Sequence, residues 1–326
     1  MDILILGSTS NICAKRVFDN LNNLHSKINT IYCYDMKNMS ELKFHKYIKT
    51  NVKIQNKNMI LNKIKYIYGN FNLTEYEKKI KNILHQKLII YVSIPPFCYE
   101  CIVQFFKDNN NYNKLILEKP LALDYNNYCI LKPLFTENVY VIDHFLYKRD
   151  IKRVIEYYKT REINKIKIKF LYENDVEDRL GYFDNVGFFI DMFQSHYLSI
   201  LYYLIGIDKI EKLLKMDINT NIRKQYNNYG GKNNIDTYFY VELKDDKHTY
   251  IFEGGKAMVK EEKILEINDL TYTINNYNDE YELYFNDLID ENVNESMIKY
   301  HDIFWKITEY INNNKKNNIS FYDKNK

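Results

Sequence analysis

Residues 2–11 read DILILGSTSN, an apolar run that ends at Gly7 and is followed by small polar residues. The apolar spacing of residues 12–24 predicts a helix directly after them. A buried strand, a glycine turn and a helix in this order are typical of the first unit of a dinucleotide-binding domain, where helix N-terminal amides receive a pyrophosphate. An ordinary β–α turn is the alternative, because Ser10 stands at the second glycine of the usual fingerprint.

Further apolar runs alternate with helical patterns as far as about residue 150. Continuous apolar runs of this kind suit strands that are buried on both faces of a parallel sheet. The expected strands are residues 29–34, 88–94, 114–117 and 139–142, with a helix at 99–107. This pattern predicts a Rossmann-like, doubly wound parallel sheet over residues 1–150.

The remaining residues, 151–326, have a different pattern, in which polar and apolar residues alternate along short strands. We expect an α+β domain with a mostly antiparallel sheet, so the fold class is α/β followed by α+β. The strands are expected at 163–171, 236–243, 248–252, 257–259, 264–267 and 271–274, and the helices at 185–205, 279–289 and 296–312. Loops or tails are expected in the Asn- and Lys-rich stretches 49–63, 219–234 and 312–326.

The composition excludes several classes of protein. The chain has 326 residues, 46% hydrophobic and 27% charged, which suits about two globular domains. A formal charge of +3, from 46 basic and 43 acidic residues, argues against a strongly basic nucleic-acid-binding protein. No apolar run reaches the ~18–20 residues of a membrane-spanning helix, and the N-terminus lacks the basic region of a signal peptide. With five cysteines and no disulfide framework, the expected compartment is the cytoplasm.

Two residues near the end of the second expected strand bear on the choice of cofactor. Asp35 ends the strand, and a carboxylate there can accept hydrogen bonds from a ribose diol, which favours NAD. Lys37 could instead meet a 2′-phosphate, which favours NADP. Asp35 could also be a simple turn residue, and the sequence leaves these alternatives open.

Several polar residues in the middle of the chain have the chemistry of a proton-transfer site. Asp143 and His144 follow a strand, at the edge where parallel sheets bind their ligands. Asp191 and His196 lie five residues apart, about 140° around an α-helix, so only one of them is expected to face a given pocket. A metal site is not expected, because the C-x-x-C pair at residues 98–101 has no second pair of ligands.

Taken in order, the motifs resemble the glucose-6-phosphate dehydrogenase family over nearly the whole chain. The spacing between residues 177 and 196 is close to the family pattern. The matching segments are GSTSNI at 7–12, YVSIPP at 91–96, LEKP at 117–120, IDHFLYK at 142–148, GYFD at 181–184, DMFQSH at 191–196, GKAM at 255–258, DEYE at 279–282 and FW at 304–305.

The resemblance implies a reaction, a cofactor and a set of residue roles. Hydride leaves C1 of β-D-glucose 6-phosphate for NADP, with NAD as an alternative, and the product is the 6-phosphogluconolactone. The implied catalytic residues are His196 as general base, Asp143 as its partner carboxylate and Lys119. The implied substrate-binding residues are His144 and Lys148 for the phosphate, and Glu177, Asp191 and Lys256. The implied cofactor-binding residues are Gly7, Ser8, Ser10, Asn11, Asp35, Lys37, Pro95 and Lys119. The implied partners are a small sugar phosphate and, through the second domain, a second copy of the chain.

The chain departs from the family pattern next to these residues. Phe145 replaces a tyrosine, Tyr147 replaces a glycine and Ile190 replaces an arginine. A sugar oxidoreductase of the Gfo/Idh/MocA type, which shares the Glu-Lys-Pro motif, is one alternative. A sugar-phosphate- or nucleotide-binding protein without catalytic activity is another.

Overall fold

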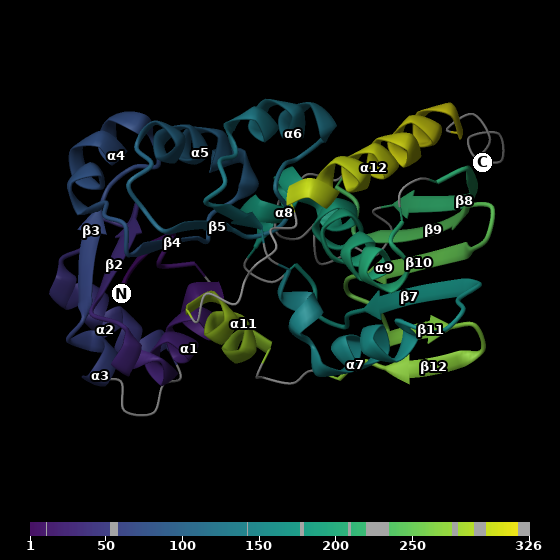
Figure 1. The fold of residues 1–326 in the computed structure, drawn as a ribbon, viewed down its shortest axis with the longest axis horizontal. Coiled ribbons are helices and arrows are strands. Elements are labelled where there is room, and N and C mark those ends of the chain that lie inside the picture. Colours follow the sequence, from purple (N-terminus) through teal and green to yellow (C-terminus); the bar gives the residue numbers. More distant parts are fainter. Residues whose placement is uncertain are drawn as a thin grey trace. The chain divides into compact units, whose positions relative to one another are not determined.

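A computed structural model of the chain divides into two compact units, and Figure 1 labels many of their helices and strands. The first unit contains Met1–Ala122, Asn126–Ile142 and Asn278–Lys299, and the second contains Leu123–Tyr125, Asp143–Tyr277 and Tyr300–Lys326. These bounds differ from the predicted 1–150 and 151–326, because a late segment rejoins the first unit. The structure describes residues 1–10, 12–52, 58–141, 143–176, 179–207, 210–219, 235–275, 280–289 and 298–318.

The first unit is built on a six-stranded sheet in which every neighbouring pair of strands is parallel. Its strands are β1 (Asp2–Leu6), β2 (Thr30–Asp35), β3 (Ile64–Tyr68), β4 (Leu88–Val92), β5 (Lys114–Leu117) and β6 (Val139–Val141). The order β3-β2-β1-β4-β5-β6 is that of a dinucleotide-binding fold, and the topological switch point lies between β1 and β4. The predicted Rossmann-like sheet is therefore confirmed, with β3 as a strand that the sequence analysis did not predict.

Two helices of the first unit begin at a residue whose side chain accepts a hydrogen bond from a free backbone amide. Ser40 caps α2 by accepting from the Lys43 amide at 3.4 Å, and Asn72 caps α4 by accepting from Glu75 at 3.0 Å. The elements are η1 (Cys13–Val17), α1 (Phe18–Asn23), η2 (His25–Lys27), α2 (Glu41–Asn51), α3 (Asn58–Leu61), α4 (Leu73–Lys79), η3 (Lys81–Ile83), η4 (Pro96–Cys98), α5 (Tyr99–Asp108), α6 (Tyr125–Leu131) and η5 (Lys132–Leu134). The prediction of a loop over residues 49–63 was wrong at both ends, where α2 and α3 lie.

The segment that returns to the first unit is α11 (Glu280–Ile289). Its Tyr284 and Phe285 rings pack against Tyr91 of β4, with ring centroids 6.4 Å and 5.4 Å away. All three rings are at most 3% exposed, so α11 completes part of the first unit's core.

The second unit contains another six-stranded sheet, in the order β12-β11-β7-β10-β9-β8. Its strands are β7 (Lys165–Leu171), β8 (Lys212–Asn219), β9 (Tyr238–Lys244), β10 (Thr249–Gly255), β11 (Glu262–Ile267) and β12 (Leu270–Thr273). Among the described strands of this second sheet, only β7 and β10 pair in parallel, so the predicted mostly antiparallel sheet is confirmed. The predicted strand at 257–259 was wrong, because Ala257 has a φ of 53° and turns the chain.

Helices pack on the second sheet through buried aromatic rings. Phe193 lies 5.1 Å from Phe252 between ring centroids, and the buried Tyr197 hydroxyl donates to the Glu253 carbonyl at 2.9 Å. The elements of this unit are η6 (His144–Tyr147), α7 (Arg149–Tyr158), α8 (Leu180–Phe188), η7 (Phe189–Tyr197), α9 (Leu198–Ile205) and α12 (Ile298–Asn318). The long helix predicted at 185–205 is thus present in three pieces. The prediction of a tail from residue 312 was wrong for residues 312–318, which belong to α12.

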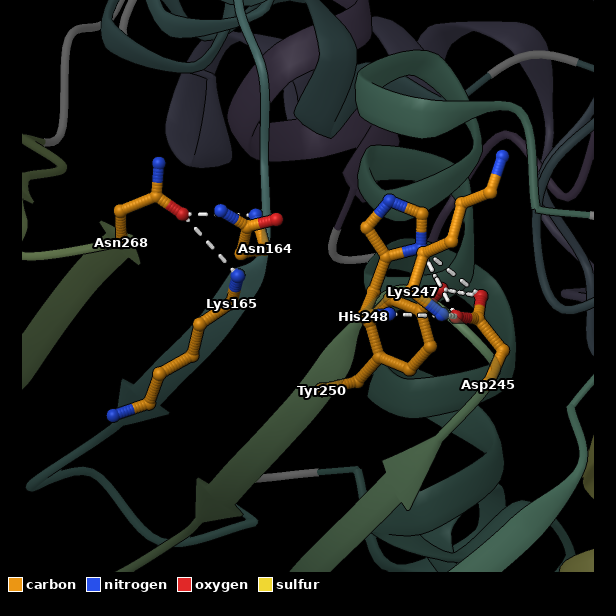
Figure 2. A network of polar contacts seen from close by, with 7 residues as sticks. All are labelled: Asn164, Lys165, Asp245, Lys247, His248, Tyr250 and Asn268. Atoms are coloured by element: carbon orange, nitrogen blue, oxygen red, sulfur yellow. Dashed lines mark hydrogen bonds and ion pairs between the residues drawn. The ribbon is translucent and has the colours of Figure 1, made fainter.

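A polar network fixes the turn between β9 and β10 (Figure 2). Asp245 accepts from the Lys247 and His248 amides at 2.7 Å, from the Tyr250 hydroxyl, and lies 3.1 Å from His248 Nδ1. Burial raises the pKa of Asp245, but these hydrogen bonds outweigh it and lower the pKa to about 2. In the described part of the chain, no helix combines the length and the apolarity needed to cross a lipid bilayer.

Candidate active site

The second unit brings together two predicted site residues that lie 53 positions apart in the chain. His196 Nδ1 lies 2.7 Å from Asp143 Oδ1, and the side chains are 7% and 0% exposed. A buried carboxylate at this distance holds the imidazole as the tautomer that donates from Nδ1. His196 Nε2 is then the ring nitrogen that can accept a proton.

Local chain geometry explains why Asp143 is so well placed. It caps η6, because its Oδ1 also accepts from the Phe145 amide at 2.9 Å. One buried oxygen thus fixes both the turn after the first sheet's last strand and the imidazole of His196. Loss of this carboxylate would leave two buried donors without that acceptor.

His196 lies on η7, which has π-helical rather than α-helical hydrogen bonding. The Ser195 hydroxyl follows the same wide turn and donates to the Ile190 carbonyl, five residues back, at 3.0 Å. A π-helix bonds residues five apart, so Asp191 and His196 lie close to one face of it. The expected 140° between them assumed an α-helix and was wrong for this reason.

Asp236, just before β9, fixes where η7 begins. Its carbonyl accepts from the Phe188 amide at 3.0 Å and its carboxylate accepts from the Phe189 amide at 2.5 Å. The backbone can reach this cap because Gly187 has a φ of 72° and ψ of 161°, a conformation open in practice only to glycine. Sequence reasoning missed Asp236, and a glycine inside an otherwise apolar helix was the available signal.

The ring of Phe145 and two basic residues surround the His196–Asp143 pair. Phe145 stacks on His196 with centroids 4.0 Å apart and planes 18° from parallel. The His144 and His196 rings are 5.0 Å apart at 75°. Lys148 is 8% exposed, and its ammonium lies 5.0 Å from the Phe145 centroid. The structure therefore brings together four predicted site residues, Asp143, His144, Lys148 and His196, around the ring of Phe145.

Two more predicted residues of the second unit have aromatic partners. Asp191 Oδ1 accepts from the Tyr182 hydroxyl at 2.5 Å, and Tyr182 is a contact that the sequence analysis did not predict. The Lys256 ammonium lies 4.7 Å from the Tyr172 ring centroid and 5.9 Å from that of Phe188. These contacts favour a charged ammonium in a partly desolvated position. Glu177 lies outside the described residues.

The first unit has the geometry of a dinucleotide turn at the end of β1. Gly7 has a φ of 85°, and a Cβ there would lie 2.3 Å from the Ser93 carbonyl oxygen. Ser10 stands at the position of the second glycine. Its hydroxyl lies 2.8 Å from the Ser93 hydroxyl and accepts a hydrogen bond from the Cys13 amide at 3.1 Å. The buried Ser8 hydroxyl has no hydrogen-bond partner among the described residues. An unsatisfied hydroxyl at the switch point fits a nucleotide phosphate.

Asp35 lies at the end of β2, beside this turn. Its carboxylate accepts from the Thr9 amide at 2.7 Å and from the Lys37 amide at 3.2 Å, and the residue is 7% exposed. The Lys37 ammonium lies 5.4 Å from the Tyr47 ring centroid. The remaining lone pairs of this carboxylate can accept hydrogen bonds from the hydroxyls of a ribose.

The other predicted residues of the first unit follow β4 and β5. Pro95 precedes η4, and Lys119 precedes Pro120 after β5, with a cis peptide bond between them. Neighbouring Glu118 accepts from the Tyr91 hydroxyl through its carboxylate and from the Tyr99 hydroxyl through its carbonyl. Asn11 lies outside the described residues.

Asp143, His144 and His196 each have one possible metal-ligand atom within 4.8 Å of the others. Zinc ligands at about 2.0–2.2 Å from the ion would be separated by about 3.3 Å in a tetrahedral site. The Asp143–His196 separation of 2.7 Å is shorter, as expected for a hydrogen-bonded pair.

Two family models match this chain. One, described as glucose-6-phosphate dehydrogenase, NAD binding domain, matches residues 4–153, and the other, glucose-6-phosphate dehydrogenase, C-terminal domain, matches residues 153–229. The chain belongs to the glucose-6-phosphate dehydrogenase family. The resemblance drawn from the motifs is therefore confirmed.

Curated relatives in the glucose-6-phosphate dehydrogenase family are distant and longer. Glucose-6-phosphate 1-dehydrogenase of Cyberlindnera jadinii is 27% identical over 236 residues, 61% of this chain and 48% of the relative. The enzyme of the same name from Borreliella burgdorferi is 25% identical over 66% of this chain and 51% of the relative. The chain thus spans about half the length of the curated relatives it matches.

Solved structures show the same fold. One described as glucose-6-phosphate dehydrogenase in complex with its substrate glucose-6-phosphate gives a TM-score of 0.70 at 17% identity, over 94% of this chain and 89% of that one. A myo-inositol 2-dehydrogenase from Lactobacillus plantarum gives 0.67 at 12% identity, over 95% of both chains. At such identities the likeness is one of fold alone.

Proposed function

We propose that this chain oxidises glucose 6-phosphate at C1 to 6-phosphogluconolactone with a nicotinamide cofactor. The observation that carries the proposal is the buried His196–Asp143 pair with His144 and Lys148 beside it. Family membership supports the reaction class, and the relatives, which the chain matches over about half of their length, carry this activity in their names.

His196 acts as the general base. Asp143 holds Nδ1, so Nε2 takes the proton from the C1 hydroxyl as that carbon is oxidised. The buried carboxylate then stabilises the imidazolium that forms, which is the logic of a base and its orienting acid. A bound nicotinamide cofactor would supply the acceptor for the hydride that C1 loses.

His144 and Lys148 bind the substrate phosphate. A phosphate dianion forms its strongest hydrogen bonds with charged donors, and these two side chains lie on the same short turn as Asp143. The low exposure of Lys148 strengthens the attraction, because less water screens it. In this proposal Asp191, Glu177 and Lys256 contact sugar hydroxyls, and Lys119 serves substrate and nicotinamide together.

In this proposal Gly7, Ser8, Ser10 and Asn11 of the glycine turn would hold the cofactor, together with Pro95, which follows β4. We propose that NAD is used at least as well as NADP. Asp35 is the reason, because its carboxylate attracts a ribose diol and repels a 2′-phosphate. Lys37 offsets part of that repulsion. Asp35→Ala is expected to lower kcat/KM with NAD more than with NADP, and equal losses would reject this role.

The central experiment compares the wild type with His196→Asn and a surface control, His85→Asn. His85 belongs to the first unit, is 41% exposed and pairs with Asp2. Initial rates are followed by the absorbance of the reduced cofactor, with glucose 6-phosphate and either NAD or NADP. We expect His196→Asn to lower kcat by ~10²–10⁴-fold and the control to leave it unchanged. A loss below fivefold would mean that His196 is not the base.

Product analysis separates this proposal from an oxidoreductase acting at another sugar carbon. Oxidation at C1 gives a lactone, which hydrolyses to an acid, whereas oxidation at a ring secondary alcohol gives a ketone. A ketone product would contradict oxidation at C1 and would support a reaction of the Gfo/Idh/MocA type. A folded chain that binds sugar phosphate without turnover would identify a binding protein.

The proposal includes a homodimer through the second unit. One face of its sheet carries half-buried side chains, among them Ile251 of β10 and Tyr240 of β9. Light scattering after size-exclusion chromatography tests this, and a monomer mass at micromolar concentration would reject it.

A further inference from the structure

Phe145 is tied to the proposed base and to its carboxylate by separate contacts. Its backbone amide donates to Asp143 Oδ1 at 2.9 Å, the same oxygen that lies 2.7 Å from His196 Nδ1. Its ring covers the imidazole, with centroids 4.0 Å apart and 18° between the planes. Side chain and backbone of one residue therefore act on the same imidazole.

The stacking has an electrostatic consequence that depends on protonation. The face of a phenyl ring carries the negative part of its quadrupole and attracts a cation placed over it. The imidazole of His196 is such a cation only after it has taken a proton. The ring therefore favours the protonated state over the neutral one, and an interaction of this kind contributes to catalysis only because it strengthens during the reaction.

We propose that Phe145 is a positioning residue for His196, which fixes the plane of the imidazole and raises its affinity for a proton. The inference rests on the proposed role of His196 as base. Phe145 has no polar side-chain atom, so it does not act through a hydrogen bond to the phosphate. Its action on the reaction passes through His196.

Other charged groups act on the same imidazole and must be separated from Phe145. From η6, Asp143 favours the protonated ring, while Lys148, 5.0 Å from the Phe145 centroid, opposes it by like charge. The His144 ring, 5.0 Å from that of His196, opposes it only when His144 is itself protonated. From η7 itself, Asp191 is engaged by Tyr182. A substitution that leaves all of these charged groups in place isolates the effect of the Phe145 ring on the imidazole.

Packing is the competing explanation for the contact. Phe145 is 7% exposed and also packs against Phe170 of β7, with ring centroids 5.6 Å apart. Phe145→Leu removes both effects and is uninformative if the chain unfolds. A series of ring-fluorinated phenylalanines at position 145, with one, two and three fluorines, keeps the volume nearly constant and weakens the quadrupole in steps.

The experiment measures two quantities across this series, with Phe145→Tyr as the conservative variant. One is the pH midpoint of the His196 ¹⁵N imidazole signal in the full-length chain, assigned by its loss in His196→Asn. The other is the acid limb of kcat/KM against pH. We expect both to move to lower pH in step with fluorination, by about half a pH unit in total, and kcat/KM to fall about threefold. Phe145→Tyr should keep both near wild type.

The outcomes distinguish the inference from the proposed function. A flat response of the imidazole signal across a series that stays folded overturns the inference, even if His196→Asn abolishes turnover. A graded shift of that signal supports the inference even in a chain without turnover, in which case the proposed function is what fails. A fall in kcat/KM with an unmoved acid limb and imidazole signal assigns Phe145 to packing alone and overturns the inference.

Discussion

Asp143→Asn is the substitution that most directly measures what the buried carboxylate does. Its Oδ1 receives both the Phe145 amide at 2.9 Å and His196 Nδ1 at 2.7 Å. The amide oxygen of the new side chain can occupy the same place and keep both hydrogen bonds, so the change removes charge with little change of shape. The side chain is 0% exposed, and bulk water does not replace the lost charge.

The magnitude follows from the distance. Charges spread over an imidazolium and a carboxylate in contact are centred about 4 Å apart, which is worth about 4 kcal/mol at an effective dielectric constant of 20. Asp143→Asn lacks this attraction at the step in which His196 takes its proton. We therefore expect kcat to fall roughly 10³-fold with little change in KM. Initial rates at saturating glucose 6-phosphate, with the fold checked by circular dichroism, provide the measurement.

Asp245→Asn is the matched control, since Asp245 also pairs with a histidine, at 3.1 Å, but in the β9–β10 turn (Figure 2). It should leave kcat unchanged. A fall of less than tenfold in folded Asp143→Asn would refute the reasoning, because the carboxylate would then orient the ring without stabilising its charge.

The remaining predictions concern stability. Gly187→Ala should lower the free energy of unfolding in urea by about 2 kcal/mol or more, since φ is 72° and a Cβ would lie 2.6 Å from Asp236 Oδ1; Gly181→Ala, with no atom of the described chain within 4 Å of the new Cβ, should be neutral or slightly stabilising. Asp245→Asn should cost about 2 kcal/mol at neutral pH, because folding lowers the pKa of this carboxyl from 3.8 to about 2. That stability is present above pH 3.8 and is lost as pH falls towards 2, so a deficit that is the same at pH 7 and pH 2 would contradict the assignment.

The first sheet was largely predictable because its central strands are apolar on both faces. β1 and β4 are almost wholly buried, and apart from Asp2 and Tyr91 they consist of Ile, Leu and Val. The strands that escaped prediction, β3 and β8, lie at the edges of their sheets, where one neighbour is missing and the polar residues break the pattern. Burial, rather than strand formation itself, is what the sequence pattern reports.

The candidate site was predictable only through the ordered motifs. Taken alone, His196 reads as an ordinary core histidine, and its α-helical spacing from Asp191 separates the two. Neither the π-helical turn nor the cap from Asp236 is a local property of the sequence, because Asp236 lies 47 residues from Phe189. Contacts of this kind depend on the tertiary fold.

The return of α11 to the first unit sets an order of events during synthesis. Tyr91 receives its cover from Tyr284 and Phe285, which leave the ribosome long after β6 ends at Val141. At roughly 5–20 residues per second, the interval is about 7–30 s. For that time the nascent first unit exposes an aromatic surface that the finished chain hides, and the second unit, whose residues lie mostly in between, is synthesised while the first is still incomplete.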